Sequence, residues 1–238
     1  MDPTSSHPSP DRFPVRASTR RRLRSGLRAV GLATAVATAS VLALGAVDAS
    51  AQAPQLAVNE LAPEITSSAD LALVAFDRYE ASGDLADYLE YAEYRAATAR
   101  FAARQLGYNE FAMIDSWRST PLDHQHAVLA AMSQVGVPYR SLSSKEDVGF
   151  DCSGLTSFAW RAAGQEIARQ SGSQIRQADR RTRETAKAGD LVQYPGHVMM
   201  YLGVGDAVIH SVQTGRTVEV DLISGRRRNS VRWGDPTV

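Results

Sequence analysis

Cysteine is nearly absent from this sequence, since Cys152 is the only one among 238 residues. A single cysteine excludes a disulfide within the chain, although a structural cysteine outside the cytoplasm would normally have such a partner. Histidine is scarce as well, with five in the whole chain. A lone cysteine is either a small buried hydrophobic residue or a reactive thiol, and its surroundings have to distinguish the two.

Net charge is also absent, because 26 basic residues balance 26 acidic ones. The balance is uneven along the chain, since seven arginines but only three aspartates lie within residues 1–51. The remainder therefore carries a net charge of −4, and its longest basic run is Arg226-Arg227-Arg228. A chain without a broad basic surface is a poor ligand for nucleic acid, so we expect no nucleic-acid partner.

Residues 1–51 are predicted to form a signal peptide. The arginines precede an uncharged apolar stretch over 29–47, and Ala49-Ser50-Ala51 supplies the small residues that signal peptidase accepts. Thr19-Arg20-Arg21-Arg22-Leu23 weakly resembles a twin-arginine signal, which leaves the export route open. The apolar stretch is long enough to span a membrane as an anchor, but its small and polar residues favour cleavage. We expect a secreted or cell-wall-associated protein without stable membrane insertion after cleavage.

Residues 52–118 are predicted to hold a flexible lead-in followed by helices. Residues 52–66 contain prolines and no clear period, which is typical of a linker. One helix is expected over about 70–81 with Ser67 or Ser68 as its N-cap, a second over 84–106, and a short one near 110–116. The break at 82–84 predicts an antiparallel hairpin, and we assign 67–118 as a helical extension.

The second of these helices carries apolar residues at spacings of three and four, and Gly107 is expected to end it. That spacing defines one predicted packing face: Leu85, Tyr88, Leu89, Ala92, Ala96, Ala99 and Ala103.

Residues 119–238 are predicted to form a second domain in which helices precede strands. Helices are expected over 124–135, ending at Gly136, and from Cys152 to about 163, ending at Gly164. Four stretches rich in β-branched and aromatic residues follow, at 190–194, 197–202, 207–212 and 217–222. Helices followed by a run of adjacent strands indicate an α+β fold with an antiparallel sheet.

Cys152 lies at the predicted start of a helix, with Asp151 or Ser153 as its possible N-cap. Free backbone N–H groups at a helix N-terminus favour a thiolate and can also donate to a developing oxyanion. Gly154 would let another chain segment approach this turn closely. These features favour a nucleophilic role for Cys152 over an inert one.

His197 and His210 lie on two predicted neighbouring strands. If Val204-Gly205 forms a tight turn, position 199 opposes position 210. A four-residue loop over 203–206 leaves this register unchanged, whereas a three-residue loop would break it. Alternate residues of a strand share a face, so His210 becomes a diagonal neighbour of His197. The geometry predicts a Cys–His–His relay, with His197 as the base and His210 fixing its tautomer and orientation.

The other histidines of this region are interpreted as ordinary helix residues. His124 and His126 are two positions apart on a predicted helix and therefore point to different faces. One cysteine and two strand histidines without a nearby carboxylate make an incomplete ligand set, so no metal and no cofactor is expected.

Three ordered motifs resemble the NlpC/P60 cysteine peptidases over about residues 121–222. They are Gly149-Phe150-Asp151-Cys152-Ser153-Gly154-Leu155, Ala188-Gly189-Asp190-Leu191-Val192 and Gly196-His197-Val198-Met199-Met200-Tyr201-Leu202-Gly203. The resemblance implies a papain-like α+β fold preceded by a helical hairpin, and hydrolysis of peptidoglycan stem peptides. The bond that such enzymes typically cut joins D-γ-glutamyl to a diamino acid, usually meso-diaminopimelate.

Carried over by position, the resemblance makes Cys152 the nucleophile, His197 the base and His210 the third polar residue. It also places Tyr139, Asp151 and Ser153 at the substrate cleft. Because an aspartate beside a thiolate would raise the thiol pKa, we expect Asp151 to point toward substrate.

Two other functions fit the same motifs. The chain could be a wall-binding or scaffolding protein with weak catalysis, or a thiol amidase or acyltransferase on the same fold. The helices over 68–117 are expected either to limit access to the cleft or to brace the second domain.

Overall fold

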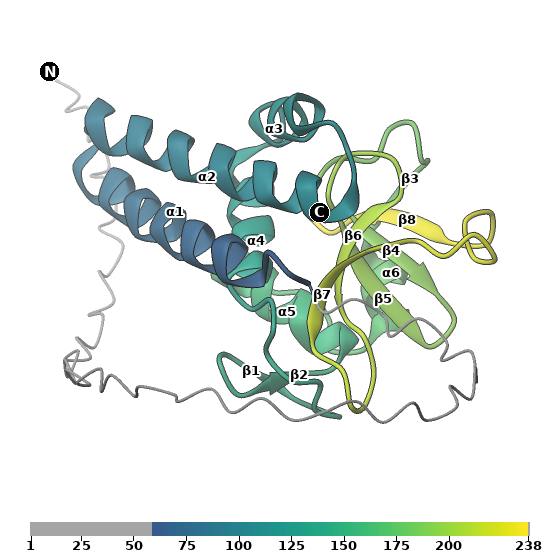
Figure 1. The fold of residues 1–238 in the computed structure, drawn as a ribbon. Coiled ribbons are helices and arrows are strands. Elements are labelled where there is room, and N and C mark those ends of the chain that lie inside the picture. Colours follow the sequence, from purple (N-terminus) through teal and green to yellow (C-terminus); the bar gives the residue numbers. More distant parts are fainter. Residues whose placement is uncertain (1–58, 238) are drawn as a thin grey trace, which may run out of the picture. The chain divides into compact units, whose positions relative to one another are not determined.

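The computed structural model describes residues 59–237, which lie within one compact unit spanning Gln52–Val238. The predicted signal peptide and residues 52–58 of the predicted lead-in lie outside the described residues. Three helices are followed by a mixture of helices and a sheet (Figure 1). Within residues 59–237, every helix is too short or too polar to cross a bilayer.

The predicted helical hairpin is confirmed. Helix α1 (Ala62–Ser82) and helix α2 (Leu85–Leu106) run antiparallel, and the short helix α3 (Glu110–Arg118) follows (Figure 1). Gly83 ends α1 in the left-handed conformation, and the Asp84 side chain then accepts from the Ala86 N–H at 2.9 Å. The turn between the helices therefore contains both a C-terminal glycine and an N-cap.

The predicted start of the first helix is wrong by eight residues, since α1 begins at Ala62 rather than near residue 70. Ser68, a predicted N-cap, lies inside the helix, and its hydroxyl donates to the Glu64 carbonyl at 2.7 Å. Pro63 occupies the first turn, where its missing N–H costs no hydrogen bond. Residues 62–66, assigned to the lead-in, are therefore helical.

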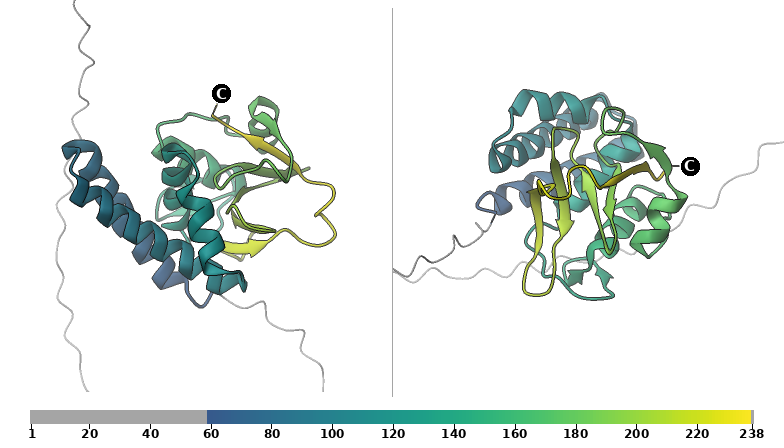
Figure 2. Two further views of the ribbon diagram at one scale, coloured as in Figure 1. Left: turned by 90° about the horizontal axis from the view of Figure 1, so that it is seen from above. Right: turned by 90° about the vertical axis from the view of Figure 1, so that its right-hand side faces the viewer.

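The predicted apolar face of α2 is wrong in its first turns, where Leu85 and Leu89 are 67% and 59% exposed. The tip of the hairpin, where α2 begins, projects away from the sheet (Figures 1 and 2). Arg95 is buried instead: it lies over the Tyr91 ring at 5.2 Å and hydrogen-bonds Gln125 of the next helix. A hydrophobic periodicity could not predict a buried arginine that has a polar partner on another helix.

A six-stranded sheet forms the centre of the second half of the chain, with every pairing antiparallel and the order β3-β8-β4-β5-β6-β7. This confirms the α+β class. The strands are β3 (Asp179–Arg181), β4 (Leu191–Tyr194), β5 (His197–Tyr201), β6 (Ala207–Ser211), β7 (Val218–Leu222) and β8 (Arg232–Asp235).

The predicted strands correspond to β4–β7, whereas β3, β8 and a small hairpin were not expected. That hairpin pairs β1 (Ser144–Lys145) with β2 (Gly149–Phe150), inside the segment predicted to be a polar loop.

Helices α4 (Leu122–Met132) and α5 (Cys152–Ala162) cover one face of the sheet (Figure 2). Helix α4 ends three residues before its predicted end and continues as turns to Gly136. The short helix α6 (Ser171–Gln177) packs near β4 and was not predicted. The core between helices and sheet holds large side chains that are fully buried, among them Leu129, Leu155, Trp160 and Met200.

The N-terminal helices are attached to the sheet by specific hydrogen bonds. The Trp117 indole N–H donates to the Leu202 carbonyl at 2.9 Å, and the Tyr108 hydroxyl accepts from the Asp206 N–H at 2.9 Å. Before α1, the Asn59 side chain accepts from the Val220 N–H at 2.8 Å. These contacts lie at the β5–β6 turn and on β7.

Candidate active site

Cys152 is the first residue of α5, as predicted, and Asp151 is the N-cap. The Asp151 carboxylate accepts from the Gly154 N–H at 2.7 Å. A Cβ at position 154 would lie 1.9 Å from the Ser143 carbonyl oxygen, so this close approach requires glycine. The sequence thus fixes the turn that presents the thiol.

The predicted cleft residues surround one cavity of about 470 Å³. Tyr139, Asp151 and Ser153 line it together with Cys152, as the sequence predicted. Among residues 59–237, all those that line this cavity lie at or after Tyr139 in the sequence, so no residue of α1–α3 borders it. The described helices therefore contact the domain elsewhere, which favours a bracing role over occlusion.

Arg169 is a cleft residue whose role sequence reasoning missed. Its guanidinium donates to both oxygens of Asp151, at 2.9 and 2.8 Å, and to the Ser153 hydroxyl at 3.0 Å. Asp151 was expected to point toward substrate. Instead its carboxylate is occupied by the helix cap and by Arg169, which offsets its negative charge beside the thiol. Arg169 lies in Ile167-Ala168-Arg169-Gln170-Ser171, a segment that resembles the Leu-Pro-Arg-x-Ser pattern of NlpC/P60 proteins, but the sequence alone suggested no role for it.

The predicted contact between the two histidines is confirmed. Strands β5 and β6 pair Met200 with Ile209 and Tyr201 with Val208, which is the predicted register. His197 Nε2 lies 2.7 Å from His210 Nδ1, and both side chains are buried.

Cys152 lies near the same end of β5, because the backbone N–H of Val198, the residue after His197, is close enough to lower the pKa of the thiol. The thiol, the two imidazoles and the start of α5 therefore converge at one end of the β5–β6 pair.

Asp221 extends the histidine pair on its far side and was also missed. His210 Nε2 is buried without a hydrogen-bond partner among the described residues, and Asp221 Oδ2 lies 3.4 Å from it. This contact helps lower the Asp221 pKa, against the effect of its burial. Asp221 belongs to β7 and pairs with Val208 of β6, which is two positions before His210. Extending the strand register from β6 to β7 would therefore have identified Asp221.

Burial dominates the electrostatics of the reacting groups. It raises the pKa of the Cys152 thiol, and the N–H groups of Val198 and Ser153 offset this only in part. Burial, together with the neighbouring His210, lowers the His197 pKa to about 3. Burial thus favours the uncharged form of both groups, whereas the helix N-terminus alone had indicated a thiolate.

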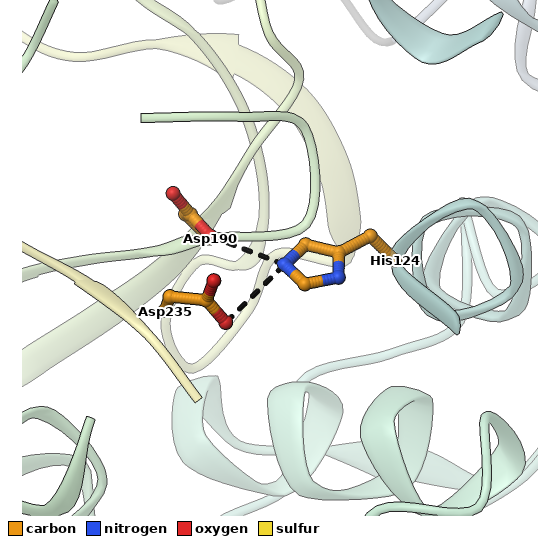
Figure 3. Close-up of side chains that lie close together, drawn as sticks. All are labelled: His124, Asp190 and Asp235. Carbon is orange, nitrogen blue, oxygen red and sulfur yellow. Dashed lines mark ion pairs between the residues drawn. The ribbon is translucent and has the colours of Figure 1, made fainter. Parts of the chain in front are cut away.

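The two helix histidines differ from each other. His126 is half-buried with its ring 4.7 Å from that of Phe76, as expected for a packing residue. His124 was interpreted in the same way, but it is fully buried beside Asp190 and Asp235, which lie far from it in the sequence (Figure 3).

The structure thus brings a thiol at a helix N-terminus and a hydrogen-bonded pair of imidazoles to one end of an antiparallel sheet. Residues 136–234 match the NlpC/P60 family. The chain thus carries an NlpC/P60 domain over these residues.

Similar proteins include peptidoglycan endopeptidase RipB of Mycobacterium tuberculosis, 38% identical over 108 residues that cover 39% of this chain and 45% of that protein. Dipeptidyl-peptidase 6 of Lysinibacillus sphaericus is 35% identical over 103 residues, covering 42% of this chain and 36% of that protein. The chain thus spans less than half the length of these relatives.

Among solved structures, RipD of Mycobacterium tuberculosis, described as a non-catalytic NlpC/P60 domain protein adapted to peptidoglycan binding, is 24% identical with a TM-score of 0.40. The match covers 48% of this chain and 98% of that one.

Proposed function

We propose that this chain is a cysteine endopeptidase that hydrolyses peptidoglycan stem peptides, at the bond between D-γ-glutamyl and meso-diaminopimelate. The observation that carries the proposal is the convergence of the Cys152 turn with the bonded pair His197–His210. The NlpC/P60 domain and its similarity to a peptidoglycan endopeptidase support the choice of substrate. A pure binding protein would have no use for this set of groups.

The proton positions follow from the contacts of the two imidazoles. Neutral His197 donates its Nε2–H to His210 Nδ1, which leaves its own Nδ1 free to take the Cys152 proton as sulfur attacks the carbonyl carbon. His210 must then carry its proton on Nε2, the atom that faces Asp221. Asp221 thereby selects the His210 tautomer that can accept from His197.

The remaining steps complete an acyl transfer. The carbonyl oxygen gains negative charge as the C–S bond forms, and the free N–H groups at the start of α5 stabilise it. The His197 imidazolium returns its proton to the leaving amine, the C–N bond breaks, and an acyl-thioester remains on Cys152. Water, deprotonated by His197, then hydrolyses the thioester and restores the thiol.

The chemistry of the cleft fits a charged peptide. Arg169 supplies a half-exposed guanidinium, and Tyr139 and Ser153 supply hydroxyl groups along the same cavity. Stem peptides carry carboxylate and amino groups, which such a polar cleft can bind. We assign the catalytic domain to 119–238 and the brace to the helical extension over 67–118. Action on the wall requires export, for which the predicted signal over 1–51 is the proposed route.

The test is digestion of purified muropeptides with the full chain and with Cys152→Ala, followed by mass spectrometry of the products. We expect the parent alone to split D-γ-glutamyl-diaminopimelate, with both proteins showing the same thermal unfolding. Retained cleavage by Cys152→Ala would contradict the proposal.

The other outcomes separate the alternative functions. Release of the whole stem from the sugar would indicate an amidase, and a stable acyl adduct would indicate a transferase. Absence of cleavage by the parent, with co-sedimentation on insoluble peptidoglycan, would indicate a wall-binding protein.

A further inference from the structure

Three buried side chains from distant elements meet on the far side of α4 from the hairpin tip. His124 comes from α4, Asp190 from the turn before β4, and Asp235 from the end of β8 (Figure 3). Their residues are 1%, 0% and 6% exposed. One ligand-type atom of each lies within 4.8 Å of the others. None of the three lines the Cys152 cavity.

Two atoms of this cluster are buried without a hydrogen-bond partner among the described residues, namely His124 Nε2 and Asp190 Oδ1. Both are aimed into the cluster (Figure 3). Leaving such atoms unpaired in a protein interior is costly, and a buried carboxylate with a single backbone partner even more so. Asp190 has only the Lys187 N–H, which donates to its other oxygen at 2.9 Å.

The distances are too long for charged hydrogen bonds. His124 Nε2 lies 3.4 Å from Asp190 Oδ1 and 3.3 Å from Asp235 Oδ1, whereas a bond from imidazolium to carboxylate contracts to about 2.7–2.9 Å. The edge of a tetrahedron whose metal–ligand bonds are about 2.0–2.1 Å long is about 3.3–3.4 Å. The two separations between His124 and the carboxylates therefore match the edge of such a tetrahedron, and all three ligand atoms lie within 4.8 Å of one another.

The outer contacts have the form found around metal ligands. His124 Nδ1 lies 3.0 Å from the Asp123 carboxylate, which would hold the proton on Nδ1 and leave the Nε2 lone pair free. Asp235 is oriented by Arg181 at 2.7 Å and by the N–H and hydroxyl of Thr237 at 2.9 and 2.6 Å. Because the Thr237 groups donate to Oδ1, a metal there would displace one of these two hydrogen bonds.

We propose that His124, Asp190 and Asp235 supply three ligands to one divalent transition-metal ion, with zinc as the ion that suits one imidazole and two carboxylates in a tetrahedral site whose fourth ligand would be water. The ion would join α4, the turn before β4 and β8, and so support the sheet that carries both active-site histidines. Its role is structural, since the ligands are buried and lie outside the cavity of Cys152.

The test uses the full chain without a histidine tag and with Cys152→Ala, because a thiol beside two imidazoles could itself bind zinc. After removal of metal with a chelator, zinc is titrated by calorimetry and the bound metal is counted by elemental analysis. We expect one ion per chain and a rise in Tm of about 5–10 °C at a hundredfold excess over Kd. Asp190→Asn should weaken binding at least about 10-fold, whereas Asp77→Asn, at an exposed aspartate on α1, should not.

The protonation of His124 provides a second readout that does not depend on a variant folding. Nitrogen NMR of the zinc-loaded chain should show His124 protonated on Nδ1 alone, with Nε2 shifted by the metal. A spectrum with protons on both ring nitrogens would mean that an imidazolium ion itself neutralises the carboxylates, and would overturn the proposal. Absence of stoichiometric zinc, or equal binding by Asp190→Asn, would overturn it as well.

Discussion

At the scale of single residues, His197, His210 and Asp221 form a row in which each side chain sets the proton position of the one before it. His197 is buried and 2.7 Å from its partner, whereas the contact of His210 with Asp221 is longer, at 3.4 Å. Asp221 is therefore a positioning residue for His210 and does not touch the reacting atoms. Its removal should be felt in the rate of the chemical step rather than in substrate binding.

We expect Asp221→Ala to lower kcat about 10-fold with KM unchanged, because His210 loses the acceptor for its Nε2–H. Asp221→Asn should lose less, since its amide oxygen can still accept that proton. Steady-state kinetics on a muropeptide substrate measure both parameters, with Asp179→Asn as the control. An unchanged kcat in Asp221→Ala would show that His210 does not depend on this carboxylate.

Alkylation of Cys152 should depend strongly on pH. Because burial raises the thiol pKa above its usual value near 9, the substrate-free chain should react slowly with iodoacetamide at pH 7 and faster as the pH rises above 9. The rate of adduct formation, measured by mass spectrometry between pH 5 and 10, checks this. A fast rate that stays constant from pH 5 to 8 would instead indicate a thiolate–imidazolium pair.

The buried His197 should make the fold sensitive to acid. Its folded-state pKa, about 3, lies below the usual 6.5, so the unfolded chain binds this proton first as the pH falls. Stability is thus full above pH 6.5 and decreases, by up to several kcal/mol, as the pH falls toward 3. His197→Gln should flatten this dependence in urea unfolding series at pH 3–7. An equal slope in the variant would contradict the assigned cause.

At the scale of secondary-structure elements, the β5–β6 hairpin was the most predictable part. The β-branched strands and the Val204-Gly205 turn define the register, and the register brings His197 and His210 together without any knowledge of the rest of the fold. The glycine and capping residues around Cys152 likewise predict its helix. Local chemistry therefore gives the positions of all three predicted catalytic residues, although their roles remain predictions.

Elements held only by distant partners could not be predicted in the same way. Strand β8 contains Gly234 and Asp235, which are uncommon in strands, and it is paired by β3 and β4, far away in the sequence. Arg169 and His124 owe their positions to carboxylates on other segments. Hydrophobic periodicity and motif spacing cannot predict contacts between such distant segments.

Insertion of one glycine after Val204 should abolish activity while the chain still folds. The extra residue shifts the β5–β6 register by one, which turns His210 to the opposite face of the sheet. We expect a loss of at least about 100-fold in kcat/KM, as for removal of a general-base partner. The same insertion after Gly225, in the exposed turn between β7 and β8, is the matched control and should leave the rate unchanged.

At the scale of the whole described unit, the N-terminal helices are fastened at the β5–β6 turn and β7, and Tyr108, Trp117 and Asn59 provide the hydrogen bonds. The Tyr108 and Trp117 contacts lie at the opposite end of the β5–β6 pair from the His197 side chain, whereas Asn59 bonds Val220, which pairs with Ile209. The helices are therefore expected to stabilise the catalytic hairpin without controlling entry to the cleft.

Trp117→Phe should lower the free energy of unfolding by about 1–3 kcal/mol, because the Leu202 carbonyl loses its donor and a small cavity forms. Turnover per folded molecule should stay the same. Phe111→Ala, at a position 81% exposed, is the control and should unfold like the parent. A lower turnover with unchanged stability in Trp117→Phe would instead connect these helices to catalysis.

Cys152 begins a helix, whereas both histidines belong to a sheet whose strands follow it in the chain. A fragment of the chain that ends before β6 lacks His210. The thiol and the two imidazoles come together only when the β5–β6 hairpin packs against α5. A chain that is still being synthesised or translocated is therefore chemically harmless to the polymer it is proposed to cut. The proposed hydrolase would therefore become active only after the whole domain has folded, and only in the compartment where folding is completed.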